Sequence, residues 1–162
     1  MKVLTLTFAL VVLLSASASS QVISFGLGAD VTFPSADLKD NVATGYGGTA
    51  LAKFGLIPLV DLTGGIEYIK FTSKDLTAGQ TGTGSAFGIL VGGRMSILAI
   101  GYFGAETGTY SFTTTIEGSD NSYTKGFFAP MVGVKLSMFD LSARYISAGN
   151  DSFWGLRGLL WL

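Results

Sequence analysis

The sequence predicts an all-β chain that folds as an eight-stranded antiparallel up-and-down transmembrane β-barrel. Alternation of apolar and polar side chains with a period of two recurs along the chain, whereas no helical stripe exceeds two turns. The predicted strands have about 9 to 14 residues, longer than the roughly 5 to 6 of globular proteins and enough to cross a bilayer. Long polar connections alternate with short ones, as expected between the two rims of such a barrel.

The composition limits the function classes. The 162 residues allow one domain, and charged residues make up only 13%, about half the usual share of a soluble domain. The chain has no Cys and no His, which excludes disulfide scaffolds, thiolate metal sites and most familiar catalytic layouts. We therefore expect no enzyme, no catalytic residue, no cofactor and no metal site. With 10 basic and 11 acidic residues, no clustered positive charge points to nucleic acid.

The first element, residues 1–20, has the three-part pattern of a secretory signal peptide. Lys2 supplies a positive charge, Val3 to Leu14 form a mostly apolar run, and Ala16-Ser17-Ala18 fits a small-residue cleavage site. The run is too short for a spanning helix, which needs about 20 apolar residues. We expect cleavage after Ala18 or Ser20, which leaves 21–162 as the barrel domain.

Eight ranges then show strand patterns, namely 22–33, 44–56, 61–71, 85–96, 99–112, 126–137, 139–147 and 152–162. The connections 34–43, 72–84 and 113–125 are long and polar, and those at 57–60, at 97–98 and around Met138 are short. The connection 148–151 is short where a long one is expected. We expect tight periplasmic turns at one rim and longer external loops at the other.

The bulk and the charge of the side chains together indicate which face of each strand points into the barrel. In the first strand, alternate positions from Ile23 to Val31 are apolar, and the opposite face carries Asp30. The second and fifth strands have weak patterns, so their charges orient them. The fourth, sixth and eighth repeat the sorting, most weakly in the eighth. Since eight strands enclose only enough room for side chains, the face with small residues and about one charge suits the lumen, and the bulky face suits lipid.

These orientations predict a lumen charge network of Asp30, Lys53, Glu67, Arg94, Glu106, Lys135, Arg144 and Arg157. The one charge left on the lipid face is Lys70, near a strand end, where its long side chain can reach the headgroups. A polar ion pathway and a structural network are both compatible with this set. We favour the network, because eight strands leave no open water channel. Five positive and three negative charges predict incomplete pairing, and Glu67→Ala is expected to leave Arg94 unpaired.

The chain resembles the OmpA/OmpX-like family of small outer-membrane β-barrel proteins. The resemblance covers the mature chain and rests on the signal peptide, the opening strand FGLGADVTFP at Phe25 to Pro34, the GAETG stretch at Gly104 to Gly108, and a C-terminal strand of alternating hydrophobic residues. In the family the last residue is usually aromatic and is read by the barrel-assembly machinery, whereas Leu162 stands there in this chain. The resemblance implies export to the cell outer membrane and contact with its lipid.

The leading hypothesis is an integral outer-membrane barrel, expected to be a monomer, with a structural or surface-interaction role. Its external loops, 34–43, 72–84 and 113–125, would bind any extracellular ligand. One alternative is a secreted soluble barrel like a lipocalin, which places apolar side chains inside to bind an apolar ligand. Another is a narrow porin-like channel.

Overall fold

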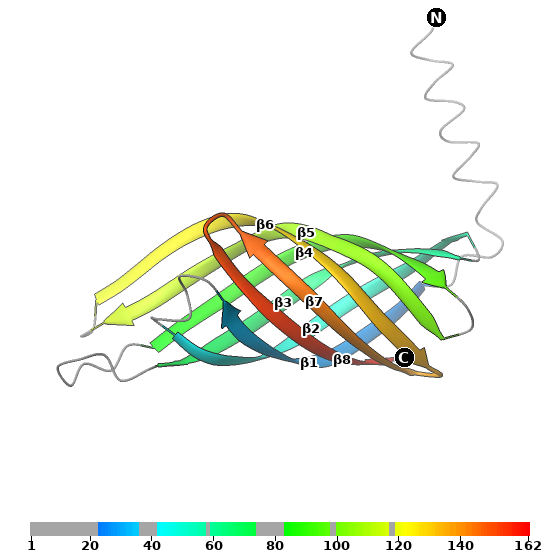
Figure 1. Ribbon diagram of the computed structural model, residues 1–162, viewed down its shortest axis with the longest axis horizontal. Coiled ribbons are helices and arrows are strands. Elements are labelled where there is room, and N and C mark those ends of the chain that lie inside the picture. Colours follow the sequence, from blue (N-terminus) through cyan, green and yellow to red (C-terminus); the bar gives the residue numbers. More distant parts are fainter. Residues whose placement is uncertain (1–22, 36–41, 58, 74–82, 98–99, 117–118) are drawn as a thin grey trace, which may run out of the picture.

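The chain folds into a closed barrel of eight strands (Figure 1). The computed structural model describes residues 23–35, 42–57, 59–73, 83–97, 100–116 and 119–162, so the predicted signal peptide lies outside the described residues. The strands are β1 (Ile23–Ser35), β2 (Val42–Ile57), β3 (Val60–Ser73), β4 (Thr83–Ile97), β5 (Gly101–Ile116), β6 (Ser119–Leu136), β7 (Phe139–Ala148) and β8 (Asp151–Trp161). No helix among the described residues has the length and apolar character to cross a membrane.

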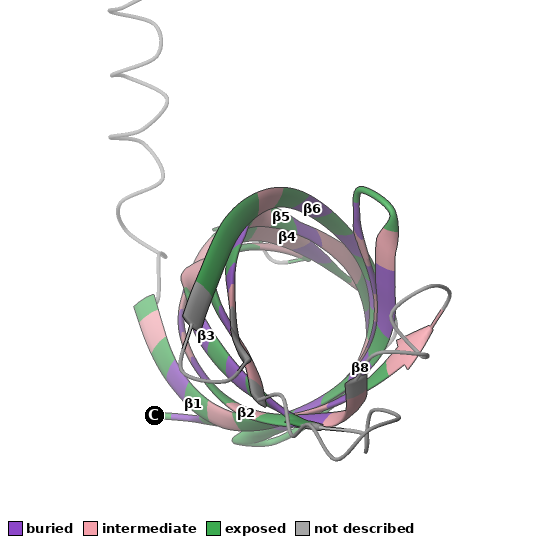
Figure 2. Cartoon of the chain, turned by 90° about the vertical axis from the view of Figure 1, so that its left-hand side faces the viewer, coloured by how far each residue is buried: buried purple, intermediate pink, exposed green. Residues whose placement is uncertain are grey.

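Each strand pairs antiparallel with the next, and β1 pairs with β8 to close the barrel. Figure 2 shows the closed ring of strands in end-on view. We call the end where β1–β2, β3–β4, β5–β6 and β7–β8 connect the loop end. The opposite end, which carries the other connections and Leu162, is the turn end. The predicted eight-stranded up-and-down barrel is confirmed.

The strand ranges differ most from expectation in the β5–β6 hairpin. Residues 113–125 were expected to form a long loop, but β5 runs to Ile116 and β6 starts at Ser119. Hydroxyl pairs join the two strands, at 3.0 Å for Ser111 Oγ and Thr124 Oγ1, and Phe112 stacks on Tyr123 with ring centroids 5.2 Å apart. β-branched threonines and cross-strand pairs favour a strand even where both faces are polar. The hairpin therefore extends the wall of the barrel at the loop end, at the left of Figure 1.

The two faces of the barrel wall are sorted as the sequence predicts. Phe25, Ile89 and Val132 point outward with 61%, 56% and 61% of their surface exposed. Arg94 and Arg157, from strands with the same alternation, are buried in the interior. Burying cations while exposing bulky apolar side chains is the inverse of a soluble barrel.

An apolar layer fills the interior toward the loop end. It consists of Ile69, Phe71, Ala86, Tyr110, Phe112, Phe127, Ile146, Ala148 and Phe153, all buried. Tyr110 lies at its centre, with its ring centroid 4.5 Å from that of Phe127 and 6.0 Å from that of Phe153. Aromatic pairs at these separations are mutually attractive. This layer was not expected from the sequence, which predicted small residues and charges in the lumen.

Candidate functional site

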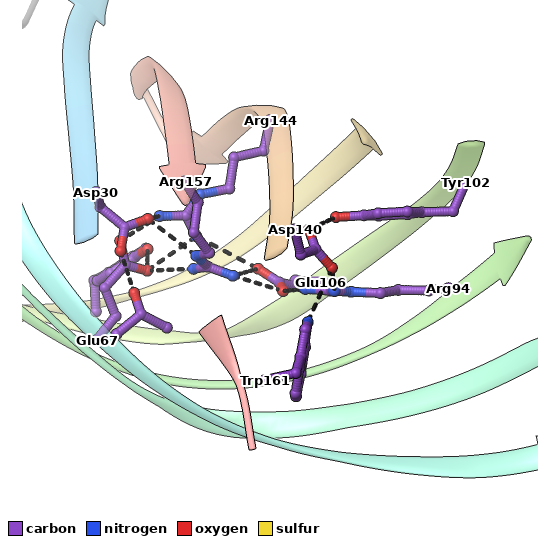
Figure 3. Close-up of polar contacts among 11 residues, drawn as sticks. Asp30, Glu67, Arg94, Tyr102, Glu106, Asp140, Arg144, Arg157 and Trp161 are labelled. Carbon is purple, nitrogen blue, oxygen red and sulfur yellow. Dashed lines mark hydrogen bonds and ion pairs between the residues drawn. The ribbon is translucent and has the colours of Figure 1, made fainter. Parts of the chain in front are cut away.

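The candidate site is the charged part of the interior, on the turn-end side of the apolar layer (Figure 3). Because side chains alternate between the faces of a strand, one inward charge fixes the direction of every second residue on it. The strand register then sets the depth of each group. Asp30 lies opposite Arg157 across the β1–β8 seam, and Lys135 opposite Asp140 across β6–β7. Inward glycines leave room beside two of the charges, since Gly92 opposes Glu106 and Gly155 opposes Arg144.

Arg144, on β7, contacts three carboxylates at the centre of the barrel. Its Nη2 donates to Asp30 Oδ1 at 2.7 Å and to Glu67 Oε1, and its Nη1 donates to Glu67 Oε2 at 2.9 Å. The same Nη1 lies 3.4 Å from Glu106 Oε2. All four side chains are fully buried. The guanidinium fork thus joins β7 to three strands that are not its neighbours.

Arg157, on β8, contacts the same three carboxylates. Its Nε donates to Asp30 Oδ1 at 3.0 Å, its Nη2 to Glu67 Oε2 at 3.0 Å, and its Nη1 to Glu106 Oε1 at 2.8 Å. Two hydroxyls complete the shell, because Thr49 donates to Asp30 and Tyr110 donates to Glu67 Oε2 at 2.8 Å. A buried ion pair offsets its desolvation only when such additional hydrogen bonds are present. We call Asp30, Glu67, Glu106, Arg144 and Arg157 the central cluster.

The central cluster carries three negative and two positive charges, and Arg94 adjoins it. Arg94 Nη2 lies 3.8 Å from Glu106 Oε1, while its Nη1 donates to Asp140 Oδ2 at 2.8 Å. Arg94 therefore links the central cluster to a second group nearer the turn end. The carboxylates are held by arginines, and the described residues contain no group of three or more potential protein ligands placed to hold a metal ion.

Asp140 is the acceptor at the centre of this second group. Tyr102 Oη donates to Asp140 Oδ1 at 2.5 Å, and Trp161 Nε1 donates to Asp140 Oδ2 at 3.2 Å. Figure 3 shows these two rings approaching Asp140 from different sides. Lys53 Nζ lies 4.6 Å from the centroid of the Trp161 ring, within the range of a cation–π contact. The penultimate residue of the chain is thus an interior residue.

The structure distributes the eight predicted lumen residues over three levels. Asp30, Glu67, Glu106, Arg144 and Arg157 meet in the central cluster, and Arg94 joins it to Asp140. Lys53 and Lys135 lie at the turn end, where Lys135 is exposed. Neither lysine has a carboxylate within 4.0 Å among the described residues.

Sequence reasoning missed two acidic residues. Asp140 and Asp61 have the inward alternation of Arg144 and Glu67, but both stand at strand ends, away from the mid-strand charges that indicate the orientation of each strand. With them the set of charges from the central cluster to the turn end has five acidic and five basic residues in the described part of the chain, so the expected excess of positive charge is wrong. The expected pairing of Glu67 with Arg94 is also wrong, because Glu67 binds Arg144 and Arg157.

The fold is that of small outer-membrane β-barrel proteins. The chain matches Ail, the attachment invasion locus protein of Yersinia pestis, in complex with the heparin analogue sucrose octasulfate, with a TM-score of 0.57 and 12% identity over 87% of this chain and 96% of Ail. It matches Neisserial surface protein A with a TM-score of 0.59 and 14% identity over 89% of this chain and 99% of the other.

A third match is Ail in a phospholipid bilayer nanodisc, with a TM-score of 0.54 and 14% identity over 86% of this chain and 98% of that one. In sequence, the chain matches no protein-family model and no curated protein. At these identities the similarity concerns the fold, and the predicted resemblance to small outer-membrane barrels is confirmed at that level.

Proposed function

We propose that the chain is an integral outer-membrane β-barrel with a filled interior, which presents its loop end at the cell surface for interaction with an extracellular ligand. The observation that carries the proposal is the inverted wall, with bulky apolar side chains outward and buried charges inward. An outward Lys or Arg at the bilayer midplane costs about 2 to 4 kcal/mol. Lys70, an outward charge, lies near the loop end of β3, where lipid headgroups are within reach.

The surface role is supported by the shape of the loop end and by the matched folds. The β5–β6 hairpin presents exposed polar side chains such as Ser122 and Thr124 beyond Phe128, the last β6 residue toward this end that pairs with β7. The names of the matched proteins place one at the cell surface and link the other to attachment and to a heparin analogue. In this proposal the chain is a monomer without enzymatic activity, is exported by residues 1–20, and is inserted by the barrel-assembly machinery.

A filled interior argues against the channel alternative. The apolar layer and the central cluster lie in series along the barrel, and both consist of buried side chains. The central cluster is in this view a structural network that ties β1, β3, β5, β7 and β8 together. We expect the purified barrel to show no stable conductance steps in planar bilayers, and reproducible steps would favour a channel.

The soluble alternative is tested by fractionation. The mature chain is expected in the outer-membrane fraction and resistant to carbonate extraction, and the folded barrel is expected to migrate faster on a gel before boiling than after it. Recovery in the soluble periplasmic or secreted fraction, without a shift on boiling, would contradict the proposal.

Orientation is tested by cysteine labelling, since the chain has no Cys of its own. Ser122→Cys places a thiol on the exposed β5–β6 hairpin, and Met138→Cys places one on an exposed turn at the opposite end. A membrane-impermeant maleimide added to intact cells should label S122C, and M138C only after the outer membrane is permeabilised. The reverse pattern would place the loop end in the periplasm and remove the proposed surface role.

A further inference from the structure

A polar cavity opens at the turn end, below the groups that surround Asp140. Its volume is about 130 Å³, enough for several waters or for an anion of a few heavy atoms. Three cationic side chains line it, Lys53, Arg94 and Lys135, together with two carboxylates, Asp61 and Asp140. The lining thus has a surplus of one positive charge.

Arg94, which lines this cavity, has unused donor capacity. Only 4% of its surface is exposed, and its Nε and Nη2 have no hydrogen-bond partner among the described residues. Nη2 faces Glu106 at 3.8 Å, beyond hydrogen-bond distance. Buried guanidinium N–H groups are rarely left without an acceptor, because the loss of hydration is costly. Both atoms are themselves buried, so an acceptor in the cavity would bond them once the guanidinium turns toward it.

The two lysines line the same cavity. Lys53 and Lys135 are close enough for their ammonium groups to repel each other, and neither has a carboxylate within 4.0 Å in the described part of the chain. Asp140 accepts from Arg94, Tyr102 and Trp161, and Asp61 attracts Lys53 without a contact within 4.0 Å, so neither of these two carboxylates pairs directly with a lysine of the cavity. Two neighbouring ammonium groups and a guanidinium that line one cavity are complementary to a single oxyanion.

We propose that this turn-end cavity binds one phosphate group. The site consists of Lys53, Lys135 and the guanidinium of Arg94, and the surplus positive charge of the lining matches a phosphate monoanion. The phosphate comes either from free inorganic phosphate or from a lipid headgroup at the adjacent rim. The site lies at the end of the barrel opposite the proposed surface-interaction region, so it is an addition to the proposed function.

The test is a phosphate titration of the folded barrel in octyl glucoside, a detergent without phosphate, at constant ionic strength maintained with chloride. Backbone amide shifts of Ser96 and Gly101, which line the cavity, report on the site. Lys135→Gln removes one ligand at an exposed position, and Lys70→Gln removes the same charge from the outer wall. We expect saturable one-to-one shifts, weakened by about tenfold or more in K135Q and unchanged in K70Q.

A second arm distinguishes the two sources of phosphate. If a lipid headgroup occupies the cavity, the barrel in phosphatidylglycerol nanodiscs without free phosphate should show the same amide shifts of Ser96 and Gly101. These shifts should be absent in K135Q. Shifts that need added inorganic phosphate in both media would identify the free anion. The proposal is overturned if neither arm gives saturable shifts, or if K135Q and K70Q behave alike. Because the first arm uses detergent, a negative result there leaves the membrane assignment untouched.

Discussion

Arg144 and Arg157 lie on adjacent strands and bind the same three carboxylates, Asp30, Glu67 and Glu106. Each guanidinium uses its planar fork to reach groups on different strands, which a lysine could not do. The two arginines therefore act as one cross-link between the β7–β8 hairpin and the wall opposite it. Removing one carboxylate affects both arginines at once.

Glu67→Ala should strongly destabilise the barrel. Both arginines lose a partner at full burial, and the Tyr110 hydroxyl loses its acceptor. Breaking a buried ion pair by removing one partner costs about 3–5 kcal/mol. Urea unfolding of the refolded barrel, followed by tryptophan fluorescence, measures the loss.

Asp61→Asn is the matched control, because Asp61 also faces the interior but is only half-buried at the turn end. Substitutions away from such buried networks usually change stability by less than about 0.5 kcal/mol. Equal unfolding free energies for E67A and D61N would show that the central cluster contributes little to stability.

The sequence predicts the faces of the barrel because the alternation along a strand is fixed by backbone geometry. Once Glu67 is assigned to the interior, Ile69 and Phe71 must follow it there. The apolar layer could have been found this way. It was missed because the lumen was expected to hold small residues and charges and the bulky face to meet lipid, where Phe87 and Trp154 do lie.

Alternation does not predict which charges meet across the lumen. Arg144 on β7 and Glu67 on β3 are not on neighbouring strands, so their contact depends on the stagger of the whole closed sheet. The sequence therefore predicts an interior network without its partners. The choice of Arg94 as the partner of Glu67 was wrong for this reason.

Gly88→Ala should destabilise the barrel by displacing Tyr110. A Cβ at position 88 would lie 2.5 Å from Cε1 and 2.9 Å from Cδ1 of the Tyr110 ring, which is itself held by neighbouring aromatic residues. Overpacking of this kind costs about 1–3 kcal/mol. The shifted ring would also weaken the hydrogen bond to Glu67, which tyrosine ring NMR signals can report.

Gly93→Ala on the same strand is the control, since the nearest atom to its new Cβ is the Asp61 carbonyl oxygen at 4.0 Å. It should be neutral or stabilise the barrel by up to about 1 kcal/mol by restricting the unfolded chain. Comparable losses of unfolding free energy in G88A and G93A would contradict a specific role for the space that Gly88 leaves for the Tyr110 ring.

Deprotonation of Lys125 should weaken its ion pair with Asp151 in strongly alkaline solution. Lys125 lies beyond Phe128, the last β6 residue toward the loop end that pairs with β7, and so outside the proposed membrane segment. Its hydrogen bond to Asp151 raises the pKa of Lys125 above the ordinary value of 10.5. A raised lysine pKa stabilises the fold fully below pH 10.5, and this contribution is lost as the pH rises through the folded value.

Carbon NMR of the Lys125 Cε through the alkaline range measures this pKa directly. Asp151→Asn removes the charge and the strongest acceptor, so the midpoint should return toward 10.5. Lys70, exposed on the outer wall, provides a reference signal in the same sample. An unchanged midpoint of Lys125 in D151N would show that the pair does not form in solution.

Ile89→Lys and Ile97→Lys place the same charge on the same outward face of β4 at two depths. Ile89 lies near the middle of the strand and Ile97 at its turn end, with 56% and 48% of their surfaces exposed. In a bilayer, an outward Lys destabilises the folded barrel by about 2–4 kcal/mol at the midplane and by about 0–1 kcal/mol near the interface. On a water-exposed wall neither substitution would be costly. Reversible unfolding in phospholipid vesicles should therefore show a larger loss for I89K than for I97K, and equal losses would contradict a wall that faces hydrocarbon.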